Sequence, residues 1–411
     1  MMMKSIRSLW ALLVLTAVAT LAVACSDDVE VVEERLVHDP FDARIDGLCY
    51  RLSPETGVAV VTAGDIYYAG DVVIPEEVVY EGMTYRVEGI ADKAFMACEK
   101  LRSVRIPQSV KEIGGRAFMM CYALREVALP ARLKVIRGET FSNCSSLAAI
   151  SIPESVEEIE ASAFFCCASL VSVTIPNRVS KIGWRCFTGC TSLISVTLSE
   201  SLTTLPEECF AHCFKLSAVT IPEGVVHIAP HAFNNCVSLA GLTLPHSLRS
   251  MGRGVFANCT ALTSAVVPAS VEEVGALLFS ECKSLAAVSW PLPTIPEGTF
   301  KGCTGLKTFE VPEGVTRICI DAFSECSLLV TLTLPGSLTT IDSGAFRNCD
   351  ALREVYCYGE TVPVLPYAFD ADGIFENVPI DKSTLHVPAS AVGAYQTTAP
   401  WNGFGRIVAI N

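Results

Sequence analysis

Hydrophobic positions along this chain recur with a long, nearly constant period. Twelve times, a Phe is followed three residues later by Cys and six residues later by Leu, and successive Phe residues lie 23 residues apart except for one step of 21. Self-similarity at a period of about 20 to 50 residues is typical of solenoids, in which each repeat buries its apolar side only against its neighbours. The twelve positions are Phe95, Phe118, Phe141, Phe164, Phe187, Phe210, Phe233, Phe256, Phe279, Phe300, Phe323 and Phe346.

Each repeat carries an apolar segment that ends at a proline. In the repeat that begins at Leu101, Val104 and Ile106 stand two residues apart, which suits a short strand. Pro107 then ends the strand, because proline removes a hydrogen-bond donor and fixes φ. Stacking such repeats pairs their strands side by side, so the pattern predicts a parallel β-sheet along one face.

We therefore predict a solenoid of about 12 to 13 coils of 23 residues for the array at 91–357. Terminal repeats must differ from internal ones because they cover the open ends of the core. Short apolar runs broken at glycines predict a β-rich N-terminal cap over 45–90. Residues 358–411 are expected to form a terminal repeat and an atypical C-terminal cap, in which Phe369 keeps the 23-residue interval without its Cys.

The N-terminus has the pattern of a secretory signal over 1–24, with Lys4 and Arg7 before an apolar run and small residues before Cys25. This ending resembles the lipobox of bacterial lipoproteins, in which the Cys becomes the new N-terminus and carries acyl chains. The resemblance implies that Cys25 is lipidated; the alternative is an ordinary secreted protein.

Residues 25–44 are acidic and lack a clear period, so we interpret them as a tether between lipid and folded protein. Ser26, Asp27 and Asp28 resemble the export signal that sends Bacteroides-type lipoproteins to the outer leaflet of the outer membrane. The resemblance implies a protein that faces the cell surface.

The composition and charge of the chain limit which kinds of partner it is expected to bind. The chain is 51% hydrophobic and only 18% charged, as expected for repeats with two inward-facing segments each. A formal net charge of −14 argues against nucleic acid or an anionic membrane surface as the main partner. Membrane association is expected through the lipid anchor only.

Nineteen cysteines suggest disulfides in an exported protein, but their spacing argues otherwise. Twelve occupy one position of the repeat, and an in-register column points their Cβ atoms in parallel, which is poor geometry for bridging. We expect buried thiols, with a few bridges between neighbours as the alternative.

The sequence also lacks the patterns of metal sites and enzymes. His227 and His231 are separated by Pro230, and no Cys-x-x-Cys pair occurs, so we expect no bound metal. Because enzyme motifs are absent too, we expect no cofactor and no enzymatic activity.

The repeat resembles the leucine-rich repeat, and more narrowly the BspA-like, or Treponema-type, bacterial subfamily, over roughly residues 45 to 411. It departs from the general leucine-rich consensus, which has Asn or Cys nine positions into the unit where this chain has Ser109 or Arg132. The resemblance implies adhesion, with host matrix or plasma proteins or other bacteria as partners.

Outward residues of the predicted strands form the candidate ligand-binding face. Extended sheets of repeat proteins are the default, usually concave, binding surface. This face is small, rich in hydroxyl groups, and poor in the aromatic residues of sugar sites and the basic residues of nucleic-acid sites, which favours a protein ligand. Alternatively, Ser and Thr are present only because they suit a stacked sheet, and binding falls on the turns or caps. The candidates are Ser103, Arg105, Glu126, Ser151, Ser172, Thr174, Ser195, Thr197, Thr220, Thr243, Glu310, Thr331, Thr333, Glu354 and Tyr356.

One repeat is two residues short, around Trp290 and Pro291. A local kink is the main hypothesis, and a partner site that uses Trp290 is the alternative.

For the whole chain we expect a monomeric, non-enzymatic, lipid-anchored outer-membrane protein of a Bacteroides-like bacterium that binds a protein ligand. A glycan-binding accessory lipoprotein for polysaccharide uptake and a structural envelope component are the other hypotheses.

Overall fold

The computed structural model describes residues 41–365 and 373–410. Its described part divides into two compact units, the first running to Val171 and including Cys186–Thr191, and the second comprising Ser172–Arg185 and the residues from Ser192 onward. Both units are built from solenoid coils of about 23 residues, which confirms the predicted fold class. The predictions for Cys25, for residues 1–24 and for Phe369 lie outside the described residues.

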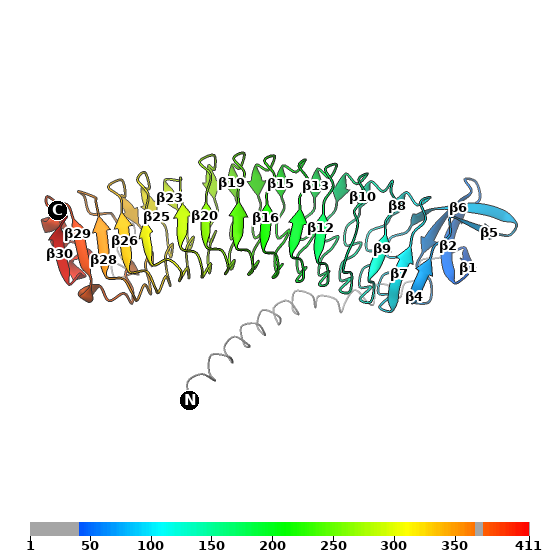
Figure 1. Cartoon of the computed structure of the whole chain (residues 1–411), viewed down its shortest axis with the longest axis horizontal. Helices are drawn as coiled ribbons and strands as arrows, with labels where there is room; N and C mark the ends of the chain where they lie inside the picture. Colours follow the sequence, from blue (N-terminus) through cyan, green and yellow to red (C-terminus); the bar gives the residue numbers. More distant parts are fainter. Residues whose placement is uncertain (1–40, 366–372, 411) are drawn as a thin grey trace, which may run out of the picture. The chain divides into compact units, whose positions relative to one another are not determined.

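A β-rich cap begins the first unit. Its strands follow the order β1-β2-β3-β6-β5, and β8 pairs with β6. Figure 1 labels β1, β2, β5, β6 and β8 of this cap. Tight hairpins at Gly47 and Gly82 join neighbouring antiparallel strands, and both glycines have positive φ, which glycine adopts without a steric penalty. The strands are β1 (Ala43–Ile45), β2 (Leu48–Ser53), β3 (Val58–Thr62), β5 (Glu77–Tyr80), β6 (Met83–Ile90) and β8 (Glu112–Ile113).

The face sheet of the first unit contains β4, β7 and β9 in that order, all parallel. No strand forms in the described coil at 147–153, which includes Ser151; Ala148 and Ala149 there have low strand propensity. Besides this face, the coils form a second ladder of two-residue strands that the sequence did not predict. The remaining strands of this unit are β4 (Gly70–Val73), β7 (Leu101–Arg105), β9 (Glu126–Ala128), β10 (Val135–Ile136) and β11 (Glu158–Ile159).

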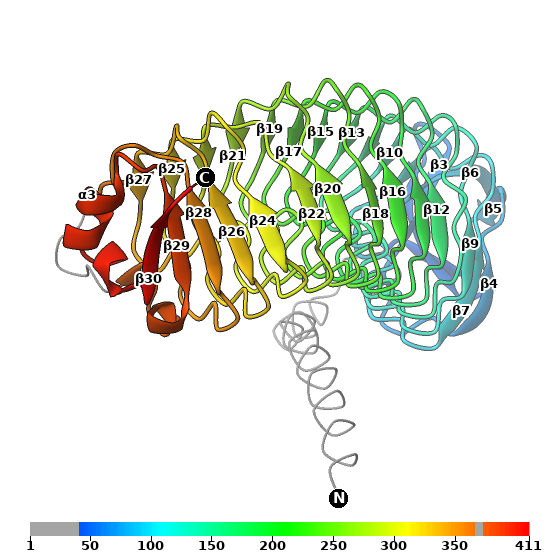
Figure 2. The same ribbon diagram turned by 60° about the vertical axis from the view of Figure 1, so that its left-hand side comes forward.

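The second unit also has two ladders (Figure 2). Its face strands are β12 (Ser172–Thr174), β14 (Ser195–Thr197), β16 (Ala218–Thr220), β18 (Gly241–Thr243), β20 (Ser264–Val266), β22 (Ala287–Ser289), β24 (Thr308–Glu310), β26 (Thr331–Leu334), β28 (Glu354–Cys357), β29 (Thr384–Val387) and β30 (Arg406–Ala409). Its second ladder comprises β13 (Lys181–Ile182), β15 (Thr204–Leu205), β17 (His227–Ile228), β19 (Ser250–Met251), β21 (Glu273–Val274), β23 (Thr294–Ile295), β25 (Arg317–Ile318) and β27 (Thr340–Ile341).

Hydrogen-bonded pairing in the second unit is interrupted at the short repeat. The face ladder is interrupted between β18 and β20 and again between β22 and β24, and the second ladder between β13 and β15 and again between β21 and β23. The later interruption in each ladder lies at the short repeat. Trp290 lies at this place, is 3% exposed, and donates its indole N–H to the carbonyl of Thr294 at 3.1 Å. The side chain thus packs inside the coil, which favours the local irregularity over a partner site at Trp290.

Stacked phenylalanines form the centre of each unit. In the second unit, Phe233 is fully buried and its ring lies 5.5 Å from that of Phe210 and 5.6 Å from that of Phe256, nearly parallel to both. In the first unit, the rings of Phe118 and Phe141 are 5.5 Å apart. Offset stacking of this kind is worth more than the area that the rings bury, so the Phe column helps to hold successive coils together.

Cysteines lie beside this column and bond to the neighbouring coil. The Cys236 thiol donates to the carbonyl of Phe210 at 3.2 Å, and the Cys144 thiol donates to that of Phe118 at 3.1 Å. All twelve cysteines of the repeat position are buried free thiols, as predicted. A sulfur atom in this position therefore fills space and also satisfies a buried backbone carbonyl.

The last coil closes around aromatic side chains. Phe375 stacks on Phe346 at 5.7 Å and extends the column. Tyr395, Trp401 and Phe404 cover it and are all buried. They come from the helix α3 (Val392–Thr397) and from the region of the 3₁₀ turn η3 (Trp401–Gly403), which follow η2 (Ile380–Lys382) and β29.

Candidate functional site

The predicted face residues of the first unit lie at its surface. Arg105 and Glu126 are exposed, while Ser103 is half-buried and its hydroxyl donates to the Asp71 carboxylate at 2.9 Å. Arg102 pairs with the same carboxylate at 2.7 Å. Ser151 is exposed but lies on the coil without a strand. This part of the face therefore carries both charges, and part of its polar surface is used by contacts within the protein.

Hydroxyl groups form rows on the first face sheet of the second unit. Ser172 lies opposite Ser195 and Thr174 opposite Thr197 in the parallel register. Thr220 and Thr243 are paired in the same way on β16 and β18. All six residues are exposed, and the residues between them, such as Val173, point into the core. The sequence therefore identified which residues face outward and which share a row.

Polar groups cluster on the last face sheet of the second unit. Glu310, Thr333 and Tyr356 follow one another in register, and Thr331 lies opposite Glu354. Glu310 is exposed, whereas Thr331, Thr333, Glu354 and Tyr356 are half-buried. This sheet differs from the hydroxyl rows because it brings carboxylate and aromatic side chains together.

His386 completes this cluster and was missed by sequence reasoning. Its Nε2 lies 2.7 Å from the Glu354 carboxylate, and its ring stacks on that of Tyr356 at 4.2 Å. It lies opposite Tyr356 in the register of β28 and β29. Because 30 residues separate the two in the chain, a fixed 23-residue interval does not pair them. The sequence signal that could have identified His386 is local: Leu385 and Val387 on either side are apolar, so alternation along a strand places His386 on the outer face.

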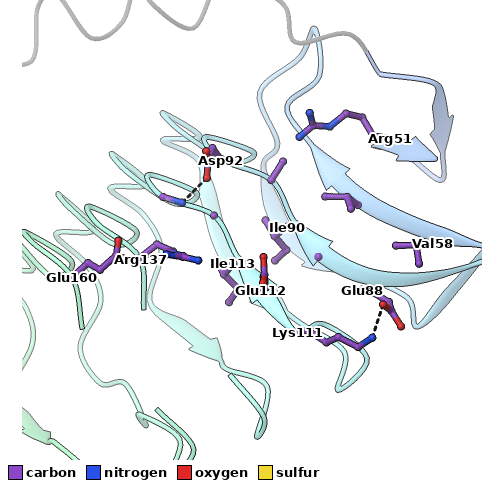
Figure 3. A pocket seen from close by; sticks show the side chains of 15 residues that line it. Arg51, Val58, Glu88, Ile90, Asp92, Lys111, Glu112, Ile113, Arg137 and Glu160 are labelled. Atoms are coloured by element: carbon purple, nitrogen blue, oxygen red, sulfur yellow. Dashed lines mark hydrogen bonds and ion pairs between the residues drawn. The ribbon is translucent and has the colours of Figure 1, made fainter. Parts of the chain in front are cut away.

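A groove of about 780 Å³ lies in the first unit, between the cap sheet and the first coils (Figure 3). Val58 and Val60 contribute apolar side chains. Lys111 pairs with Glu88 at 2.6 Å across two adjacent coils. Arg137 pairs with Glu160 at 3.0 Å, and the Asp92 carboxylate accepts the Gly115 amide at 2.8 Å. Most charges of the groove are therefore neutralised by their neighbours, and no single class of ligand is favoured there.

The buried thiols are poor nucleophiles. Burial raises the pKa of Cys190 and of Cys236 to about 12, so both remain protonated near neutral pH. No group of three or more His, Cys, Asp and Glu side chains that could hold a metal ion occurs within 41–365 and 373–410. His227 instead bonds to the Ser250 hydroxyl at 2.7 Å. The same residues contain no helix that is both long and apolar enough to cross a membrane.

Comparison with solved structures finds similar solenoids in other bacteria. A leucine-rich repeat protein from Bacteroides ovatus is 27% identical with a TM-score of 0.73, and the alignment covers 90% of this chain and 100% of that one. A leucine-rich cell surface protein from Faecalibacterium prausnitzii is 29% identical with a TM-score of 0.56, covering 78% of this chain and 96% of that one. No curated protein matches the chain.

Comparison with protein families gives a match over most of the solenoid. The model of the BspA type leucine rich repeat region matches in six copies over residues 82–183, 157–286 and 278–392. Proteins of this family are generally non-enzymatic repeat scaffolds. Together with the coils, the Phe column and the face strands described above, this match shows that the chain belongs to the BspA-type leucine-rich repeat family.

Proposed function

We propose that this protein is a non-enzymatic, lipid-anchored cell-surface protein that binds protein ligands through the face strands of its second unit. The observation that carries the proposal is the in-register arrangement of exposed polar side chains on those strands. Thr174 and Thr197 lie side by side above buried valines, on strands fixed by backbone pairing. A rigid surface of this kind binds without losing much conformational freedom, which favours affinity for a large partner.

The chemistry of the face favours a polypeptide partner. Hydroxyl groups both donate and accept hydrogen bonds, so rows of Ser and Thr match the alternating N–H and C=O groups of a protein surface. The Glu354, Tyr356 and His386 cluster adds a carboxylate, an aromatic ring and an imidazole at one place. Tyrosine is enriched at the energetically important centres of protein interfaces. We therefore place the strongest contacts of the proposed ligand at this cluster.

The location at the cell surface rests on the N-terminal sequence. Residues 1–24 have the pattern of a signal, and Cys25 has the position of a lipidated cysteine. The similar structure from Faecalibacterium prausnitzii is described as a cell surface protein, which supports the same placement here. Attachment of host matrix or plasma proteins, or of other bacteria, is the biological role that we propose for this surface.

The proposal is tested by affinity capture with the full chain and two matched variants. Thr197→Arg places a large cation on the face strand β14, whereas Thr204→Arg makes the same change on the second ladder at β15. Both threonines are exposed, so neither change should unfold the protein. We expect Thr197→Arg, but not Thr204→Arg, to reduce capture of host or bacterial proteins by at least about tenfold, which corresponds to about 1.4 kcal/mol.

Two results would contradict this function. Equal capture by both variants would show that the face strands do not bind the ligand. Resistance to protease shaving of intact cells, with cleavage only after lysis, would place the protein inside the envelope and favour the structural alternative. Binding on a glycan array that is lost with Glu354→Gln would instead favour a glycan ligand at the cluster of Glu354, Tyr356 and His386.

A further inference from the structure

A second cleft lies in the first unit, next to strand β4. It has a volume of about 400 Å³ and is lined by the β1–β2 turn and by β4. Ile45, Leu48 and Ile66 contribute aliphatic side chains to its walls. Val72 and Val73 of β4 line the cleft as well. None of these residues belongs to the face strands of the second unit. The cleft is therefore a separate candidate site.

The edge of β4 is open toward this cleft. β4 is the terminal strand of the sheet β4-β7-β9 (Figure 1). The amides of Gly70 and Ile74 donate to carbonyls of the β7 segment, at 2.9 and 3.0 Å. Since successive amides of a strand point to opposite edges, those of Asp71 and Val73 point to the other edge. Such a row of backbone groups is a template for pairing with a further strand.

The side chains around the edge fit an apolar segment. Val73 is 64% exposed and Ile66 is 47% exposed, which is unusual for branched aliphatic residues beside a cleft. Tyr50 also lines the cleft, and its buried hydroxyl has no hydrogen-bond partner among the described residues. Tyr50 is itself 0% exposed, so the apolar character of the cleft that a ligand would meet comes from the aliphatic side chains and not from this hydroxyl.

Negative charge lies at the rim of the same cleft. The carboxylates of Asp46 and Asp71 both belong to its lining, where no cation is found. Asp71 has a partner in Arg102 on the side of β7, whereas Asp46 has no ion pair within the described residues. A segment with a basic side chain next to its aliphatic ones would therefore match both the charge and the apolar walls.

We propose that this cleft binds an extended segment of a partner protein by addition of a strand to the open edge of β4. The segment carries branched aliphatic side chains at alternate positions, one of them in register with Val72, and Lys or Arg between them near Asp46 and Asp71. In this mode of recognition, main-chain hydrogen bonds supply affinity and pockets for alternate side chains supply specificity. The site is independent of the face strands of the second unit and does not need the function proposed for them.

The test uses a labelled peptide, Val-Lys-Val-Lys-Val, and the full chain in fluorescence anisotropy. Val73→Pro removes one of the two outward amides of β4 and leaves the bonds to β7, because the Val73 amide points away from β7. Val73→Ala is the matched control that keeps the amide. We expect Val73→Pro to weaken binding at least about tenfold and Val73→Ala to weaken it by about threefold at most.

A second measurement keeps the test decisive if Val73→Pro does not fold. The same peptide N-methylated at every backbone amide has unchanged charge but cannot donate hydrogen bonds to β4 in either strand direction, so it should bind the unaltered protein at least about tenfold more weakly. Equal affinity of the two peptides, or no saturable binding below about 1 mM, would overturn the proposal. Self-association of the protein that Val73→Pro abolishes would assign the edge to a second copy instead and would equally overturn the assigned partner.

Discussion

The column of buried thiols makes the stability of the second unit sensitive to alkaline pH. Burial raises the pKa of Cys236, Cys282 and Cys349 to about 12, against about 8.5 for a thiol in an unfolded chain. Above about pH 8.5 the unfolded chain releases these protons while the folded protein keeps them. The stabilisation is therefore complete below about pH 8.5 and is lost as the pH rises toward 12.

The size of the effect follows from the linkage between protonation and folding. Each such thiol lowers the free energy of unfolding by about 1.4 kcal/mol for each pH unit between the two pKa values. Three thiols together give about 4 kcal/mol per pH unit, which is a large part of the typical stability of about 5 to 15 kcal/mol. Cys259, Cys303 and Cys326, whose pKa values burial also raises, steepen the loss.

The assay is chemical denaturation at about pH 8, 9 and 10 in the presence of a reductant, followed by tryptophan fluorescence. Cys236→Ala is the control variant. It lowers stability at every pH because it removes the bond to the carbonyl of Phe210, but it should also reduce the pH slope by about 1.4 kcal/mol per unit. Equal slopes in the two proteins, or a stability of the unaltered protein that does not change from about pH 9 to 10, would refute the reasoning.

Three further predictions concern packing, backbone conformation and thiol access. Phe233→Ala should lower the free energy of unfolding by about 3 to 5 kcal/mol, because the ring is fully buried between two neighbours; a loss below about 1 kcal/mol in denaturation would contradict the stacked column. Ser162 has a φ of +54°, so Ser162→Gly should raise the denaturation midpoint by relieving about 1 kcal/mol of strain, whereas the control Ser172→Gly in a strand should lower it. Cys319 is half-buried while the other free thiols of the described residues are buried, so a thiol reagent should modify it first, and that fast reaction should be absent from Cys319→Ser.

The 23-residue period predicted the coils because the buried positions recur at that interval along the chain. It placed Phe233 above Phe210 and Ser195 beside Ser172, and it correctly identified the column of thiols as a packing feature. The alternation of Val173 with Ser172 also predicted which side chains of the face are exposed. These features depend on spacing alone, so a sequence is sufficient to find them.

Features that depend on how segments fold back were not visible in the sequence. The two-residue strands of the second ladder are too short to give a pattern of alternation. His386 was missed because the last coil is longer than the period, and pairing in space with Tyr356 is decided by the sheet register. Ser151 was assigned to a strand that does not form. The residues next to it have low strand propensity, and their position in the repeat is not enough to make them a strand.

The sequence by itself determined a BspA-type solenoid, its inward columns and its outward rows, because a repeat that cannot bury its apolar side alone must stack on its neighbours in register. Only the tertiary structure decided which polar groups meet and which backbone edge stays open. The bond between Glu354 and His386, and the cleft between β4 and the turn at Gly47, join segments whose separation in the chain follows no period. Contacts of that kind arise from packing in three dimensions, and the cluster around His386 and the cleft at β4 depend on them, whereas the hydroxyl rows follow from the period.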